Sequence, residues 1–138
     1  MLLMIEKVII LKSVNLFSKI PESTLLSIAT QLREVQYDEG QTIITQGDLG
    51  TSMYILVRGT VEVIIDGHVI ATQREIDIFG ELAALDPEPR SATIKTTQET
   101  LVFEISSTLI YNLISEYPSV ARGIIKILCN RIRDNNKH

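Results

Sequence analysis

The chain has 138 residues, of which 45% are hydrophobic and 22% are charged, and its formal net charge is -4. This length fits one domain with a real hydrophobic core, and the composition is globular rather than disordered. A negative net charge argues against binding to nucleic acid, so an anionic ligand would need a local positive site.

Cysteine and histidine usage argues against several kinds of site. A single cysteine, Cys129, cannot form an intrachain disulfide, which is typical of a reducing compartment. It lies in an apolar helical pattern, so we interpret it as a buried structural thiol. The two histidines, His68 and His138, fall in a turn and at the last position. We therefore expect no metal centre, no resident cofactor and no catalytic activity.

The first seven residues, MLLMIEK, have no basic leading region, and their apolar run is too short for a secretory signal. No apolar run approaches the roughly 18 residues that a membrane helix needs. We therefore expect a cytoplasmic chain that does not itself enter a membrane.

Helical periodicity marks the N-terminal part of the chain, residues 1–34. Apolar residues recur with helical spacing in segments 5–12 and 25–32. Pro21 and Glu22 suit a first helical turn, where a missing N–H costs nothing and a carboxylate meets the positive end of the dipole.

The middle of the chain, residues 35–105, changes to short strands. The pair Asp66-Gly67 is typical of a type I′ hairpin turn, which needs positive φ at both central residues. Many short strands with turns between them predict a roll or jelly roll rather than a parallel sheet. Six runs rich in β-branched residues are predicted as strands: Thr42–Thr45, Tyr54–Val57, Val61–Ile65, Val69–Thr72, Ala92–Thr96 and Leu101–Ile105.

Residues 106–134 return to a helical pattern, interrupted at Pro118. Gly123 within the last helix costs about 1 kcal/mol relative to alanine, so we expect a close contact there. The helix has a wide apolar face that predicts a partner: the same domain's roll, a second copy or a flanking effector domain. That face carries Val120, Ile124, Ile127 and Leu128.

The segment Phe79–Ile94, FGELAALDPEPRSATI, carries the chemistry. Gly80 permits a tight turn, and the short apolar run that follows predicts a one-turn helix whose first N–H groups could seat a phosphate. Arg90 offers a planar fork for two phosphate oxygens, Ser91 a hydroxyl, and Glu81 an acceptor for a sugar hydroxyl. On spacing alone, Glu81 and Arg90 could equally form a structural ion pair.

This segment closely resembles the phosphate-binding cassette of the cyclic nucleotide-binding domain family. Protein kinase A regulatory subunits, cyclic-nucleotide-gated channels and the catabolite activator protein share that module. Segments 43–63 and 16–29 resemble its lead-in strands and its helical entry, so the resemblance covers nearly the whole chain. It implies a mainly β fold, a β-roll or double-stranded jelly roll, with N-terminal helices and C-terminal helices of the B and C type. The whole chain, 1–138, would be one such domain with a cassette at 79–94.

The resemblance also implies roles for individual residues. Arg90 would pair with the cyclic phosphate of a 3′,5′-cyclic nucleotide, and Glu81 would accept its ribose 2′-hydroxyl. Two positions depart from the family pattern: Ile76 precedes Asp77 where glycine is usual, and Thr51 replaces a frequent aspartate in what we expect to be a surface turn. The rest of the ligand cradle would be backbone N–H groups around Leu82, Ala83, Ser91 and Ala92, with Gly80 at the turn.

Base selectivity is weakly encoded. Ser91 could contact a guanine amino group or simply bind phosphate, and we favour cyclic AMP over cyclic GMP. Arg131 and Asn135 stand where relatives place residues that approach the ribose-binding carboxylate and the base. They could equally be solvated residues near a fraying end.

The sequence thus favours a regulatory module that binds a cyclic nucleotide and transmits binding through movement of its C-terminal helices. A cupin-type metalloenzyme would need a cluster of histidines and carboxylates on inward-facing strand positions. The two histidines, in a turn and at the last position, cannot supply it. A fragment of a catabolite-activator-type regulator would continue into a helix-turn-helix beyond this segment. A scaffold that has lost its ligand is the remaining alternative, and intact Gly80, Glu81 and Arg90 argue against it.

Overall fold

The computed structural model describes the backbone of residues 1–74, 78–80, 85 and 89–135. They form two compact units. One is a β-roll, Gln31–Ile110, and the other is a helical unit built from segments 2–30 and 111–138.

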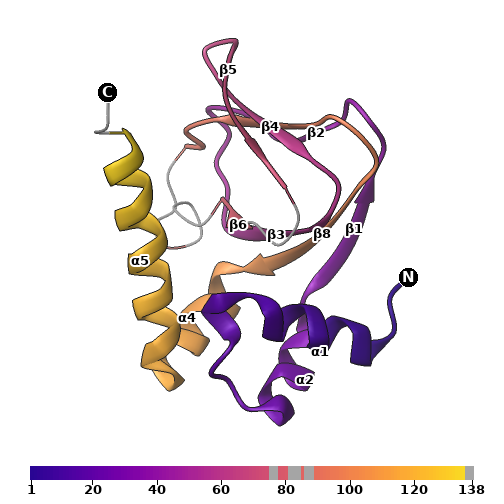
Figure 1. Cartoon of the computed structure of the whole chain (residues 1–138), viewed down its shortest axis with the longest axis vertical. Helices are drawn as coiled ribbons and strands as arrows, with labels where there is room; N and C mark the ends of the chain where they lie inside the picture. Colours follow the sequence, from indigo (N-terminus) through magenta and orange to yellow (C-terminus); the bar gives the residue numbers. More distant parts are fainter. Residues whose placement is uncertain (75–77, 81–84, 86–88, 136–138) are drawn as a thin grey trace. The chain divides into compact units, whose positions relative to one another are not determined.

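The roll consists of two four-stranded antiparallel sheets (Figure 1). The first sheet has the order β1 (Arg33–Tyr37), β8 (Thr100–Ser106), β3 (Ser52–Arg58) and β6 (Ile78–Phe79). The second has the order β2 (Thr42–Ile44), β7 (Thr93–Thr96), β4 (Val61–Ile65) and β5 (His68–Gln73). The predicted mainly β fold, with helices before and after the roll in the chain, is therefore confirmed.

All six strands predicted from the sequence are present, with ends within two residues of the expected ones. Two strands were missed. The run REVQY of β1 begins with two charged residues, Arg33 and Glu34, and has the polar Gln36 after its valine, so the apolar alternation that marks a strand is weak. The two residues of β6 are too few to show any period.

The predicted hairpin turn is confirmed. Asp66 has φ 51° and Gly67 has φ 79°, both positive as a type I′ turn requires. The turn joins β4 to β5, with Ile65 opposite His68, and the hairpin is labelled in Figure 1.

An apolar cluster fills the interior of the roll. It draws side chains from both sheets, so closing the roll removes them from water together. Two of its members, Tyr54 and Phe79, stack with ring centroids 5.1 Å apart and nearly parallel planes. The other buried members are Ile44, Leu56, Val61, Ile94 and Val102.

The helical unit is built around the short 3-10 helix η1 (Asn15–Phe17), which contacts both α1 and α5. The close contact expected at Gly123 is confirmed, because a Cβ there would lie 2.8 Å from Leu16 Cδ1. The α-helices are α1 (Met4–Ser13), α2 (Glu22–Gln31) and α5 (Pro118–Asn135), and α4 (Ser107–Glu116) belongs to this unit from Tyr111 onward.

The prediction that Cys129 is buried is wrong, because this thiol has intermediate exposure. Val120 and Ile124 on α5 are buried, whereas Ile125 and Ile132 are 59% and 60% exposed. The apolar stripe read from the sequence is wider than the part of the helix that packs, and Cys129 lies beyond that part. None of the helices within the described ranges is both long enough and apolar enough to cross a membrane.

Candidate functional site

Arg90 is the centre of the candidate site, and its backbone is fixed by the turn that follows β2. Its N–H donates to the carbonyl of Asp48 at 2.7 Å, and its own carbonyl accepts the N–H of Gly47 at 2.8 Å. The neighbouring Leu49 and Pro89 form an isolated antiparallel bridge. The turn after β2 therefore sets the position of the Arg90 backbone.

The side chain of Arg90 is held inside the roll, with 9% of the residue exposed. Nη1 donates to the carbonyl of Gly80 at 3.0 Å, and Nη2 donates to the carbonyl of Ser52 at 2.9 Å. The guanidinium carbon lies 5.9 Å from the centre of the Tyr54 ring, within the range of a cation–π contact. These contacts orient the planar fork of the guanidinium.

Two glycines leave the space that the guanidinium occupies. A Cβ on Gly50 would overlap the Nε, Cζ and Nη2 atoms of Arg90. Gly80 has φ 79°, and a Cβ there would lie 2.8 Å from Nη1. Gly80 is thus required both for its left-handed backbone and for the approach of Arg90.

Burial and charge act against each other at this site. Burial lowers the pKa of Arg90, while Tyr54 and the Glu104 carboxylate act in the opposite direction. Arginine is too strong a base to lose its proton at neutral pH, so the guanidinium stays charged. Burial, followed by the Glu104 carboxylate, raises the pKa of Tyr54 to about 12, so its hydroxyl remains a donor.

A pocket of about 300 Å³ opens beside Arg90, within the roll. Gly80, Ser91 and Ala92 do not line it, so among the described residues predicted for the site only Arg90 reaches this space. Its polar lining combines the guanidinium with two carboxylates. The lining residues with polar side chains are Thr45, Asp48, Thr51, Ser52, Tyr54, Arg90 and Glu104.

The predicted site residues have different outcomes. Gly80 and Arg90 are brought into contact, 10 residues apart in sequence. Ser91 is exposed and Ala92 is partly buried, directly after Arg90. Glu81, Leu82 and Ala83 lie outside the described residues, so their predicted contacts, including the alternative Glu81–Arg90 ion pair, stay predictions.

The two residues predicted to approach the ligand from the last helix, Arg131 and Asn135, belong to α5 in the helical unit. Their contact with a ligand in the roll stays a prediction. Within the part of the chain that is described, no group of three or more histidine, cysteine, aspartate or glutamate side chains could hold a metal ion.

Sequence reasoning missed four residues around Arg90: Gly50, Ser52, Tyr54 and Glu104. Thr51, which we expected to be a surface-turn residue, is exposed but lines the pocket as well. One signal was available, because Glu104 is the only charged residue in the otherwise apolar run LVFEI. A carboxylate at a strand position that should face a core indicates a partner. The carbonyl of Ser52 gave no signal, because backbone acceptors are not encoded by residue type.

Comparison with known proteins adds three findings. The family profile described as "Cyclic nucleotide-binding domain" matches residues 34–117. The "CRP-like cAMP-activated global transcriptional regulator" of Mycobacterium tuberculosis is 25% identical over 134 residues, which cover 94% of this chain and 60% of that protein. The "cGMP-dependent protein kinase" of Toxoplasma gondii is 38% identical over 100 residues, which cover 72% of this chain and 10% of the kinase.

Among solved structures, cAMP-bound PfPKA-R is similar over 97% of this chain and 45% of its own, with a TM-score of 0.80 and 28% identity. The chain therefore spans 60% or less of the length of each of these relatives.

Proposed function

This chain belongs to the cyclic nucleotide-binding domain family, and from that premise we propose that it is a regulatory module that binds a 3′,5′-cyclic nucleotide. The observation that carries the proposal is the guanidinium of Arg90, buried inside the roll and held by the carbonyls of Ser52 and Gly80. A buried cation is costly unless it is compensated, and a cyclic phosphate would supply a full negative charge.

The geometry suits a singly charged, compact anion. Two carbonyl bonds use two of the five N–H groups of the guanidinium. As far as the described residues go, donors remain for two phosphate oxygens. In this proposal Glu81 accepts the ribose 2′-hydroxyl, and backbone N–H groups near Leu82, Ala83, Ser91 and Ala92 complete the cradle.

We favour cAMP over cGMP as the ligand. The Mycobacterium tuberculosis relative is described as cAMP-activated, and the PfPKA-R structure contains cAMP. The Toxoplasma gondii relative is described as a cGMP-dependent protein kinase, so cGMP is the second candidate ligand. In this proposal the hydroxyl of Ser91 binds phosphate rather than a guanine amino group.

Binding would be transmitted through the C-terminal helices α4 and α5, with Arg131 and Asn135 near the ligand. A partner would then meet α5, where Ile125 and Ile132 are exposed. We propose a second copy or a flanking effector domain as that partner, and no catalytic role for the module itself. Two functions compete with this one: a scaffold without ligand, and part of a catabolite-activator-type regulator.

The experiment is a calorimetric titration of the purified chain, stripped of carried-over ligand, with cAMP and with cGMP. We expect micromolar or tighter binding of at least one nucleotide, with cAMP the tighter. Tighter binding of cGMP would assign Ser91 to the base. Absence of heat and of any thermal shift with both would favour the scaffold.

A further inference from the structure

A row of four side chains crosses the first sheet of the roll from edge to edge. Strand register places Arg33 on β1 opposite Glu104 on β8, Glu104 opposite Tyr54 on β3, and Tyr54 opposite Phe79 on β6. Residues directly opposite in an antiparallel sheet point to the same face. The row therefore ends at Phe79, the residue immediately before Gly80.

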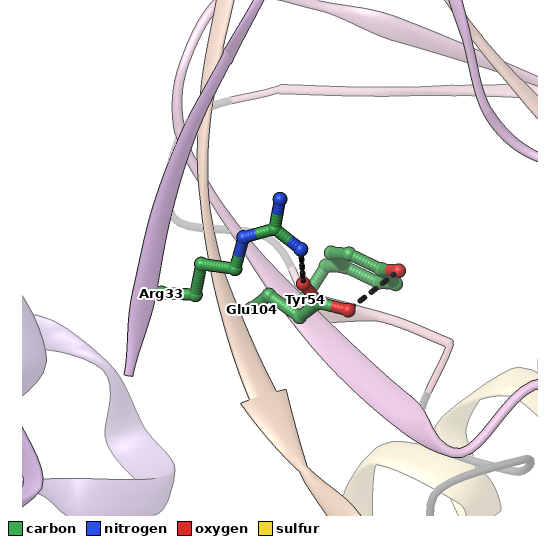
Figure 2. Close-up of polar contacts among 3 residues, drawn as sticks. All are labelled: Arg33, Tyr54 and Glu104. Carbon is green, nitrogen blue, oxygen red and sulfur yellow. Dashed lines mark hydrogen bonds and ion pairs between the residues drawn. The ribbon is translucent and has the colours of Figure 1, made fainter. Parts of the chain in front are cut away.

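Each neighbouring pair in this row is in contact. The Tyr54 hydroxyl donates to Glu104 Oε2 at 3.2 Å, and Arg33 Nη1 lies 3.4 Å from Glu104 Oε1 (Figure 2). At the other end, the Tyr54 ring stacks on Phe79. The same ring lies under the Arg90 guanidinium, so Tyr54 joins the carboxylate to the buried cation.

The contacts differ in strength. Arg33 has a side chain that is 75% exposed, and an exposed pair at this distance contributes little. Tyr54 is 8% exposed and the Glu104 side chain is 23% exposed, so their hydrogen bond is shielded from water. The contacts that matter are the hydrogen bond between Tyr54 and Glu104, within the row, and the contact of the Tyr54 ring with Arg90, outside it.

This arrangement gives Arg90 a negative charge in its surroundings without a tight ion pair. A carboxylate bound directly to the fork would occupy donors that a phosphate needs and would have to be displaced. Glu104 instead acts through the tyrosine and through space, while the fork is aimed by two carbonyls. The charge of the cation is compensated only in part, and its donors stay directed toward a ligand.

We propose that Tyr54 and Glu104 are positioning residues that fix the Arg90 guanidinium for the phosphate of the ligand. The proposal rests on the proposed function, because that function supplies the phosphate. The ordering of Arg90 by Tyr54 and Glu104 does not depend on any ligand. The two parts can therefore be tested separately, with the same set of variants.

The first test observes Arg90 without ligand. In ¹⁵N-labelled protein, the Nε–Hε signal of Arg90 is identified by its loss in Arg90→Lys. We expect Tyr54→Phe and Glu104→Gln to shift this signal and to speed its exchange with water by about threefold or more, since an ordered guanidinium is protected. Glu99→Gln, which removes the charge of an exposed glutamate in the same unit, should leave the signal unchanged.

The second test is a double-mutant cycle on cAMP affinity. We expect Tyr54→Phe, which keeps the ring and its stack, to weaken binding about threefold to tenfold, as expected for one shielded hydrogen bond to a charged group. In the Arg90→Lys background, which has no fork to aim, the same change should cost less than about twofold.

Three outcomes are distinguishable. An unchanged Arg90 signal in both Tyr54→Phe and Glu104→Gln overturns the positioning role, whatever the affinity. Equal loss of affinity from Tyr54→Phe in the unaltered chain and in the Arg90→Lys background overturns it as well, because a merely structural effect is independent of the fork. If the unaltered chain binds neither cAMP nor cGMP, the proposed function fails, and the ligand-free signal still decides whether the row orders Arg90.

Discussion

Two glycines in the roll, Gly67 and Gly50, are glycine for different reasons. Gly67, in the β4–β5 turn, has φ 79°, and a Cβ there would meet nothing within 4 Å. Gly50 does not have a positive φ, but a Cβ there would overlap Arg90. Gly67 is glycine because its backbone has a positive φ. Gly50 is glycine because the side chain of Arg90, 40 residues away along the chain, occupies the space of a Cβ.

The two glycines should therefore affect different properties of the protein, Gly67 its stability and Gly50 its ligand affinity. A change at the β4–β5 turn should lower the free energy of unfolding and leave ligand affinity alone. A change around Gly50 and Arg90 should do the reverse, because the guanidinium is the far end of a flexible side chain that can move aside. The free energy of unfolding and the ligand affinity of each variant distinguish the two cases.

The largest effect is expected for Arg90→Ala. Removing the guanidinium should weaken cyclic nucleotide binding by about 2–5 kcal/mol, as for a buried charge pair that loses one partner. Calorimetry measures this loss, and chemical denaturation shows whether the variant is folded. Arg58→Ala, at an exposed position on β3, is the matched control and should bind as the unaltered chain does. Unchanged affinity of Arg90→Ala would remove Arg90 from the site.

Gly50→Ala should come next. Alanine tolerates the backbone there, so stability should change little, but its methyl group displaces the guanidinium from the carbonyls of Ser52 and Gly80. We expect binding to weaken by about 1.5–3 kcal/mol, the range for a hydrogen bond to a charged group. The measurement is the same titration.

A double variant makes the Gly50 prediction specific. In Arg90→Ala the methyl group has nothing to displace, so Gly50→Ala should add no further loss of affinity. A full additional loss in the double variant would mean that Gly50 acts on the ligand by another route.

Much of the fold could be predicted because its signals are local. The β4–β5 turn is encoded by two adjacent residues, Asp66 and Gly67, whose φ values are both positive as expected. Gly123 was predicted to allow a close contact, and Leu16 provides it. Strand β1 could not be found, because its charged residues hide the alternation of the strand.

The site could be predicted only in part. The resemblance pointed to Gly80 and Arg90, which do meet. It did not point to Ser52 or Glu104, because these come close only when β3 and β8 pair, 38 and 14 residues from Arg90 in sequence. Backbone carbonyls and cross-strand neighbours depend on register, which a single sequence encodes weakly.

Gly67→Ala is the counterpart of Gly50→Ala. Its methyl group has room, but alanine at φ 79° costs about 1–2 kcal/mol of left-handed strain. Urea denaturation should show a loss of stability of this size, and cyclic nucleotide affinity should be unchanged. A loss of affinity that exceeds the loss of stability would contradict the separation of the two regions.

The smallest effect is expected at alkaline pH. The pKa of Tyr54 is raised from 10.0 to about 12 by burial and then by Glu104, so the folded protein holds this proton more tightly than the unfolded chain. The resulting stabilisation is complete below the unfolded pKa and is lost as pH rises from about 10 through about 12. Tyr37, whose pKa is also raised by burial, adds a contribution of the same sign.

Tyr54→Phe should therefore make unfolding in urea less dependent on pH across that window, without abolishing the dependence that Tyr37 supplies. Tyr111→Phe, which alters a tyrosine that is 47% exposed, is the control and should keep the slope of the unaltered chain. The changed slope would report the environment of the Tyr54 hydroxyl. Equal slopes in Tyr54→Phe and the unaltered chain would mean that the Tyr54 hydroxyl is not shielded beside Glu104, and the row across the sheet would lose its central link.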